Sequence, residues 1–189
     1  ISERTIGDGA DDITTTGGND LIIAGGAADT VAAGDGANVV LGDSGSYIVT
    51  GADFALTSAL TDGDDVDSIT TGVGRDLLIG GGAGDTLTAG AGDNVVLGDS
   101  GSYTVAGTLH TVTSERTEED GDDAITAEGG ADWVIGGGGA DSIDVDDADL
   151  TTDAGNVVLG DSGSFSQDGS TLNLRSERTR GDGGDTITT

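Results

Sequence analysis

Single large aliphatic residues recur along the chain at intervals of nine, each lying two positions after an Asp or an Asn. In the first run these residues are Ile13, Ile22, Val31 and Val40, and glycine-rich segments separate them. Glycine, Asp and Asn favour turns, whereas the β-branched residues around each aliphatic position favour strands. The pattern therefore predicts very short β-strands joined by tight turns.

The nine-residue spacing returns twice more, and a last copy lies near the end of the chain. Thirteen residues head these copies: Asp11, Asp20, Asp29, Asn38, Asp67, Asp76, Asp85, Asn94, Asp123, Asp132, Asp141, Asn156 and Asp185. Asn156 comes later than the period requires because the acidic stretch 144–150 contains six additional residues. A short, regular repeat of this kind predicts a solenoid, in which each repeat adds one unit to a stack.

Composition and charge exclude several functions. The chain carries 30 Asp and 6 Glu against 6 Arg, for a formal net charge of -30, and it has 37 Gly and no Cys. This charge repels phosphates, so we expect no nucleic-acid partner. The absence of Cys excludes disulfides and thiolate metal sites. Composition alone is typical of a disordered chain, but a strict period indicates ordered turns.

The sequence predicts neither an enzyme nor a membrane-inserted protein. The single histidine, His110, has no acid or nucleophile at motif spacing, and the many Ser and Thr residues have no histidine base to activate them. We therefore expect no catalytic residues and no organic cofactor. No run of about 18 apolar residues is present, so we expect no membrane insertion.

The repeat resembles the RTX (repeats-in-toxin) calcium-binding nonapeptide, GGxGxDxUx, in which U is a large aliphatic residue. The resemblance implies an all-β parallel β-roll, or β-solenoid, with two nonapeptides in each coil. Turns on the same edge would then be 18 residues apart, with calcium held between them by Asp side chains and turn carbonyls. The first glycine of the motif is missing in the first four copies, where Ile6, Thr15, Ala24 and Ala33 occupy it.

The resemblance assigns all thirteen heading residues as calcium ligands and implies about six Ca²⁺ ions, which would bring the formal charge to about -18. The implied pairs are Asp11 with Asp29, Asp20 with Asn38, Asp67 with Asp85, Asp76 with Asn94, Asp123 with Asp141 and, across the insertion, Asp132 with Asn156. Asn keeps the oxygen but lacks the charge, so we expect its sites to be weaker and each calcium ladder to end there.

A longer period of about 56 residues groups the nonapeptides into modules. The stretch Asn-Val-Val-Leu-Gly-Asp-Ser-Gly-Ser recurs three times, followed each time by an aromatic residue. We place module 1 at 2–57, module 2 at 58–113 and module 3 at 114–175, with 176–189 as the start of a truncated module 4. The chain is thus expected to be one continuous solenoid from a longer tandem array.

Each module also contains a variable segment, which predicts either a β-hairpin or an irregular third coil of the solenoid. In module 1 the expected strands 47–50 and 54–58 flank a turn at 51–53, and in module 3 the turn is expected at 168–169. With a third coil, each module would lengthen the rod by about 14 Å.

The residues beside the inward aliphatics alternate between copies. They are mostly polar or small in odd copies, counted from Asp11, and apolar in even copies, so one sheet would be apolar on both faces and must be covered. The hairpin is the nearest cover, and self-association with a neighbouring chain is the alternative. Trp133 and Tyr47 are therefore expected to pack and not to stack on a ligand.

The sequence favours an extracellular calcium-binding structural segment, such as an adhesin stalk, a surface-layer component or a matrix filament. RTX proteins are typically secreted unfolded and fold outside the cell, where calcium is millimolar, so the resemblance implies a secreted or cell-surface location. One alternative is the secretion domain of an exported enzyme or toxin. Another is an ice-binding solenoid, because the odd copies present Ser and Thr outward, although Asp12, Ala32, Ala124 and Asp144 interrupt them.

Overall fold

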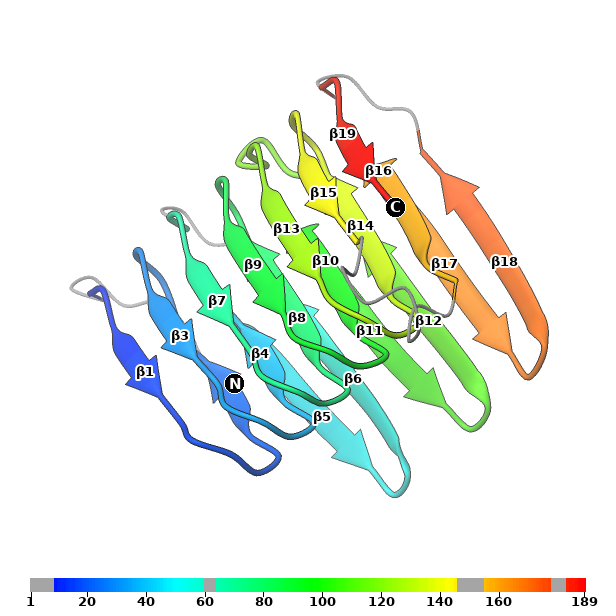
Figure 1. Cartoon of the computed structure of the whole chain (residues 1–189), viewed down its shortest axis with the longest axis horizontal. Helices are drawn as coiled ribbons and strands as arrows, with labels where there is room; N and C mark the ends of the chain where they lie inside the picture. Colours follow the sequence, from blue (N-terminus) through cyan, green and yellow to red (C-terminus); the bar gives the residue numbers. More distant parts are fainter. Residues whose placement is uncertain (1–8, 60–63, 146–154, 178–182) are drawn as a thin grey trace.

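The computed structural model describes residues 9–59, 64–145, 155–177 and 183–189, which form strands and turns. The chain winds into coils that stack one after another from β1 to β19 (Figure 1). Each coil adds one strand to each of two parallel sheets, and an antiparallel sheet lies beside them. The predicted all-β parallel solenoid is confirmed.

The strands fall into three sheets. The odd sheet contains β1 (Asp12–Thr14), β3 (Thr30–Ala32), β7 (Ser68–Thr70), β9 (Thr86–Ala89), β13 (Ala124–Ala127), β15 (Ser142–Asp144) and β19 (Thr186–Thr188). The even sheet contains β2 (Leu21–Ile23), β4 (Val39–Leu41), β8 (Leu77–Gly81), β10 (Val95–Asp99), β14 (Trp133–Gly137) and β16 (Val157–Asp161). The hairpin sheet contains β5 (Gly45–Thr50), β6 (Asp53–Ser58), β11 (Gly101–Ala106), β12 (Leu109–Ser114), β17 (Gly163–Asp168) and β18 (Thr171–Ser176).

The aliphatic residues predicted to point inward form the core between the odd and even sheets. Parallel pairing without a register shift places Val31 beside Ile69 in the odd sheet and Val40 beside Leu78 in the even sheet. Small alanines such as Ala89 fill the remaining space in this core. Burial of each Val, Ile or Leu contributes roughly 1.5–3 kcal/mol, so the single inward aliphatic residue of each nonapeptide stabilises its coil.

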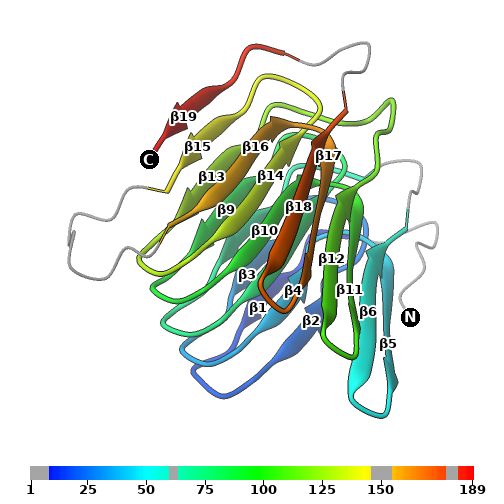
Figure 2. The same cartoon turned by 90° about the vertical axis from the view of Figure 1, so that its right-hand side faces the viewer.

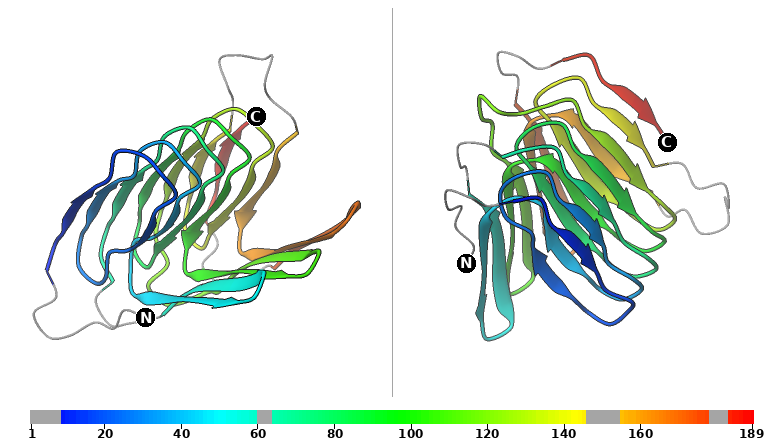
Figure 3. Two further views of the ribbon diagram at one scale, coloured as in Figure 1. Left: turned by 90° about the horizontal axis from the view of Figure 1, so that it is seen from below. Right: turned by 90° about the vertical axis from the view of Figure 1, so that its left-hand side faces the viewer.

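The hairpin sheet covers the outer face of the even sheet (Figures 2 and 3). Successive hairpins pair through β6 with β11 and through β12 with β17. Leu97 and Ile135 of the even sheet are fully buried under Leu56 and Phe165 of the hairpins. The chain itself thus supplies the predicted cover, and the Trp133 ring packs edge-on against Phe165 at 6.2 Å between centroids, as expected for a packing residue.

The hairpin turns differ from the prediction by one residue in two modules. Asp53 and Asp168 are predicted in the turns but belong to strands, where they pair with Thr50 and Thr171. The two-residue loops instead start with a glycine in all three hairpins, at φ between 57° and 68°. A type II′ turn requires glycine at this position, and the preference for it outweighs the turn preference of Asp.

Each of the three full modules contributes two strands to each of the three sheets. Because strands in a sheet are about 4.8 Å apart, two coils and one hairpin both advance by about 10 Å. The hairpin sheet and the solenoid therefore lengthen by the same distance in each module. This agreement explains why each module combines two coils with one hairpin. The third coil and the rise of about 14 Å per module are not found.

Candidate metal-binding edges

The turns of the solenoid lie on two opposite edges. The joint edge is the side where even strands end and odd strands begin, and the hairpins leave the solenoid there. The plain edge is the side where odd strands end and even strands begin. The turns of the joint edge lead into Asp11, Asp29, Asp67, Asp85, Asp123, Asp141 and Asp185, and those of the plain edge lead into Asp20, Asn38, Asp76, Asn94, Asp132 and Asn156.

On the joint edge, each heading Asp donates its backbone N–H to the Oδ1 atom of the next one. The N–H of Asp67 donates to Asp85 at 2.7 Å, and the N–H of Asp123 donates to Asp141 at 2.9 Å. The same bond crosses module boundaries, as between Asp29 and Asp67 at 2.7 Å. The carboxylates thus form one continuous ladder in which each side chain fixes the turn of the preceding coil.

The plain edge has an equivalent ladder in which Asp and Asn alternate. The N–H of Asp76 donates to Oδ1 of Asn94 at 3.0 Å, and the N–H of Asn94 donates to Oδ1 of Asp132 at 2.8 Å. The predicted pair across the insertion is also formed, because Asp132 donates to Asn156 at 2.9 Å. This hydrogen-bonded ladder continues through the Asn residues.

The structure brings together all six predicted pairs, and it adds contacts that the sequence analysis missed. Pairs 38 residues apart, such as Asn38 and Asp76, are also neighbours, because the hairpin leaves the solenoid between them. The signal for these contacts is the 56-residue period, since removing a 20-residue excursion from 38 returns the 18-residue spacing of one coil. Asp185 completes the joint-edge ladder by accepting from Asp141 at 3.1 Å.

The second oxygen of many of these carboxylates is buried without a hydrogen bond. On the joint edge this holds for Oδ2 of Asp67, Asp85, Asp123 and Asp141. On the plain edge it holds for Oδ2 of Asp20 and Asp76. A buried polar atom without a partner costs about 1–3 kcal/mol, and more when it is charged, so a positively charged partner would stabilise each of these turns.

Glycines at the ends of the even strands provide room for these oxygens. Oδ2 of Asp123 and the carbonyl oxygen of Gly136 both lie beside the Cα of Gly98. A Cβ at Gly98 would collide with both oxygens. Gly80 has the same relation to Oδ2 of Asp85 and to the carbonyl oxygen of Gly98. Each glycine therefore permits a carboxylate oxygen and a carbonyl oxygen from neighbouring coils to converge.

Burial changes the acidity of these carboxyl groups. Desolvation, together with the neighbouring carboxylates, raises the pKa of Asp85 and Asp123 to about 9. Desolvation likewise raises the pKa of Asp67 and Asp141 to about 7. Without a cation these groups are therefore driven toward protonation, and a bound divalent ion would favour their charged form.

The oxygen atoms on these two edges suit a hard cation if main-chain carbonyls act as ligands together with the carboxylates. In the described ranges, no three Asp, Glu or His side chains form a group that could hold a metal ion by themselves. The turns nevertheless combine buried carboxylate oxygens with glycine carbonyls, and calcium binds six to eight such oxygens. Any coordination shell at these edges must therefore include main-chain oxygens.

Two further buried acids were not assigned as site residues in the sequence analysis. Oδ2 of Asp43 accepts the N–H of Gly82 at 2.7 Å, and Oδ2 of Asp99 accepts the N–H of Gly138 at 2.6 Å. Desolvation raises the pKa of both Asp43 and Asp99 to about 9. These side chains hold the glycine-rich turn of the following coil on the joint edge. The available signal is that an Asp recurs five positions after each module's Asn.

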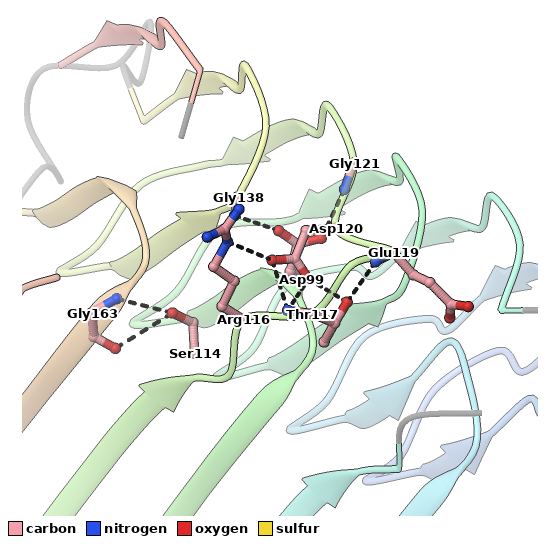
Figure 4. A network of polar contacts seen from close by, with 9 residues as sticks. All are labelled: Asp99, Ser114, Arg116, Thr117, Glu119, Asp120, Gly121, Gly138 and Gly163. Carbon is pink, nitrogen blue, oxygen red and sulfur yellow. Dashed lines mark hydrogen bonds and ion pairs between the residues drawn. The ribbon is translucent and has the colours of Figure 1, made fainter. Parts of the chain in front are cut away.

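The joint after the second hairpin shows how the chain returns to the solenoid (Figure 4). Asp120 accepts the backbone N–H of Thr117 at 2.9 Å, and Arg116 approaches the same carboxylate at 4.0 Å. Oδ1 of Asp99 accepts the N–H of Gly121 at 3.1 Å. The Ser-Glu-Arg-Thr motif thus belongs to a hydrogen-bonded segment that positions the turn before Asp123.

The comparisons with known proteins agree with this geometry. The family model of the RTX calcium-binding nonapeptide repeat matches residues 5–40, 61–96, 70–105 and 119–149, which together make up more than half of the chain. These ranges include every predicted ligand position except Asn156 and Asp185. No curated protein and no solved structure matches the chain.

Proposed function

Because the chain belongs to the RTX calcium-binding nonapeptide repeat family, we propose that it is an extracellular structural segment whose folding depends on Ca²⁺. The nonapeptide repeats of this family bind calcium. The finer proposal is that calcium turns a flexible chain into a section of rod, as in an adhesin stalk, a surface layer or a matrix filament. The proposed ligands are the heading Asp residues together with turn carbonyls; the heading Asn residues are also predicted as ligands from the sequence, but Nδ2 of Asn38 and Asn94 donates to carbonyls of their own turns.

The observation that carries this proposal is the ladder of buried, uncompensated carboxylates on the joint edge. Asp67, Asp85 and Asp123 are each at most 2% exposed, and each has a buried oxygen without a hydrogen bond. Successive carboxylates repel one another, and the chain supplies only six Arg for 36 acids. A divalent cation between the turns would remove the repulsion between carboxylates, because it neutralises their charge. It would also coordinate the buried oxygens that have no hydrogen bond.

Calcium binding is therefore expected to be coupled to folding. The oxygens converge only when consecutive coils are stacked, so an unfolded chain has no comparable site. Ordering 37 Gly residues also costs more backbone entropy than ordering the same number of other residues. The binding free energy of the ions must offset that cost, which makes the folded fraction dependent on calcium concentration.

An extracellular, load-bearing role fits both the metal and the architecture. Millimolar calcium outside the cell would keep moderate-affinity sites occupied. All three sheets run the length of the solenoid, so each module continues its neighbours without a flexible linker where the structure describes the chain (Figure 3). The described residues contain no helix that is long and apolar enough to cross a membrane. Self-association through the even sheet would require the hairpins to leave its outer face.

Ice binding is a second candidate because of the outer face of the odd sheet. Strand pairing aligns Thr30, Ser68 and Thr86 in one exposed row on this parallel sheet. A regular array of hydroxyl groups is the feature that favours this function. Ala32 and Ala124 interrupt the rows of hydroxyl groups. A measurement of thermal hysteresis in the presence of calcium decides whether this face binds ice or is only solvated.

Circular dichroism during a calcium titration tests the main proposal. Metal-free protein should show a coil spectrum, and added Ca²⁺ should convert it to a β spectrum that EGTA reverses. Matching ionic strength with NaCl separates specific binding from charge screening, and Mg²⁺ tests whether the larger ion is required. A β-rich spectrum in EGTA would refute ion-coupled folding. An attached catalytic domain in the full-length protein would favour the secretion-domain alternative over the structural role.

A further inference from the structure

Two Asn side chains on the plain edge already bind the carbonyls of their own turns. Nδ2 of Asn38 donates to the carbonyl oxygens of Gly34 and Gly36, at 2.8 and 3.1 Å. Asn94 makes the same two bonds to the carbonyls four and two positions before it, at 2.8 and 2.9 Å. Both side chains are at most 1% exposed, although the glycines whose carbonyls they bind are half-buried.

The Asp that heads the other turn of the module has no such bonds. Asp76 occupies the equivalent turn position one coil away, and its Oδ2 is buried without a hydrogen bond. An ionised carboxylate cannot donate a hydrogen bond, so it cannot satisfy turn carbonyls as the Asn amide does. Asp20 has a buried Oδ2 in the same situation.

We infer that Asn38 and Asn94 replace a calcium ion in their turns, so that ions on the plain edge are confined to the turns headed by Asp. This inference rests on the proposed function, because it concerns where the calcium of that function binds. The amide N–H groups satisfy the carbonyls that a cation would otherwise coordinate. An ion placed there would lose two oxygen ligands and would meet the positive end of the amide dipole.

The same side chain also prepares the next site along the edge. The backbone N–H and Nδ2 of Asn38 both donate to Oδ1 of Asp76, at 2.8 and 3.1 Å. These two bonds fix Oδ1 of the Asp76 carboxylate, whereas its Oδ2 is buried without a hydrogen bond. In each Asn-headed turn, the amide N–H groups thus satisfy the turn carbonyls without a metal ion. The same side chain orients the carboxylate of the neighbouring Asp-headed turn.

This arrangement reduces the charge that the folded chain must neutralise. With Asp at both positions, the plain edge would bury two more negative charges, and each would need an ion. Asn156 shows a different solution after the insertion, because its Nδ2 donates to the carbonyl oxygen of Val145 at 3.0 Å. The test therefore uses the first two modules, in which the turn has its regular length.

The test compares the number of calcium ions bound by Asn38→Asp, by Asn94→Asp and by the unaltered chain. Equilibrium dialysis against ⁴⁵Ca²⁺, starting from chelator-treated protein, gives the stoichiometry. Each substitution is expected to add about one bound ion, because it restores the carboxylate that the other turns possess. Asn173→Asp is the control: Asn173 is exposed on a strand of the hairpin sheet, so the substitution adds the same charge outside the turns of the two solenoid edges.

A second readout is independent of the ion count. Thermal unfolding in metal-free buffer should begin at a lower temperature for Asn38→Asp than for Asn173→Asp, because only the former loses the two bonds from Nδ2 to the carbonyls of Gly34 and Gly36. If Asn38→Asp does not fold without metal, the same comparison is made as the calcium concentration at half-folding, which should rise. Unchanged stoichiometry together with an unchanged unfolding midpoint would overturn the inference.

The location of the ions can be observed directly. A crystal structure grown in calcium, with anomalous scattering to locate the ions, should show none on the carbonyls of Gly34 and Gly36. An ion on these carbonyls would overturn the inference even if the proposed function is correct. If the unaltered chain bound no calcium, the proposed function would fail, and the inference would still be decided by whether Asn38→Asp and Asn94→Asp acquire binding.

Discussion

The backbone N–H of Asp85 donates a 2.7 Å hydrogen bond to Oδ1 of Asp123, which lies 38 residues further along the chain but only one strand away in the odd sheet. The second oxygen of each carboxylate remains buried without a hydrogen bond. One oxygen of each side chain therefore belongs to the fold, whereas the other is left for a ligand. This division of roles explains why an acidic ladder can be both structural and ion-dependent.

Replacement of Asp85 by Asn should separate these two roles. The amide keeps the oxygen that accepts the N–H of Asp67 and removes the buried charge. We expect Asp85→Asn to raise the stability of the metal-free protein by roughly 1–3 kcal/mol and to lower the number of bound Ca²⁺ ions. Folding by the osmolyte TMAO in EGTA, followed by circular dichroism, measures the first effect, and equilibrium dialysis measures the second.

Asp12→Asn is the matched control for this substitution, because Asp12 is exposed on β1 and changes the net charge equally. It should leave the calcium stoichiometry unchanged. Equal behaviour of the two variants would mean that the joint-edge carboxylates are not ligands.

The glycines at the ends of the even strands should matter for calcium affinity as well as for stability. A Cβ at Gly98 would displace Oδ2 of Asp123, so Gly98→Ala should cost about 1–3 kcal/mol and should also raise the calcium concentration needed for folding. Gly107→Ala offers the comparison, since Gly107 has a positive φ of 63° but open space around it. Because folding and binding are coupled, Gly107→Ala should raise the calcium midpoint only through its loss of stability, whereas Gly98→Ala should raise it further by displacing a ligand oxygen. Calcium midpoints that rise in the same proportion to the loss of stability in both variants would show that Gly98 does not position a ligand.

Much of the fold follows from the nine-residue period. One aliphatic residue in each nonapeptide, such as Val31 or Leu78, has only one way to be buried, and this sets the two sheets and their register. The apolar outward residues of the even copies also indicate that a cover is needed, and the hairpins provide it. The periodic pattern predicts these features because the same inward and outward positions recur in each copy of the repeat.

The sequence pattern does not determine the contacts that join one module to the next. The bond between Asp29 and Asp67 depends on where the hairpin leaves the solenoid, and nothing in the nonapeptide spacing specifies this. The roles of Asp43 and Asp99 also depend on tertiary packing, because they bind turns 39 residues ahead. Likewise, only the geometry of the turn shows that the amide nitrogen of Asn38 points at carbonyls.

Without calcium, the fold should become more stable as the pH falls. Asp43, Asp85, Asp99 and Asp123 have a pKa of about 9 in the folded protein, against 3.8 for an unperturbed carboxyl. Between these two values the folded state binds more protons than the unfolded state, so the free energy of unfolding decreases as the pH rises through this window.

Folding of resin-treated, metal-free protein by the osmolyte TMAO, followed by circular dichroism between about pH 5 and pH 9, measures this trend; the loss of stability should be nearly constant up to about pH 8 and should flatten toward pH 9. Saturating Ca²⁺ should weaken or reverse the dependence, because the ion binds the deprotonated form. Stability that rises with pH in the metal-free protein would show that these carboxyls are ionised and compensated in the fold.

The hairpin sheet should act as a stabilising layer that the single tryptophan can report. Phe165 is fully buried and lies against Trp133, so Phe165→Ala removes the contact that holds the third hairpin on the even sheet. We expect a loss of about 3–5 kcal/mol in the free energy of unfolding in calcium and a red shift of Trp133 emission, since the indole becomes more hydrated. Val49→Ala is the control, because Val49 is 57% exposed on the first hairpin. If Phe165→Ala left both the emission maximum and the stability unchanged, the hairpins would be attached by backbone pairing alone, and the apolar face of the even sheet would not need them.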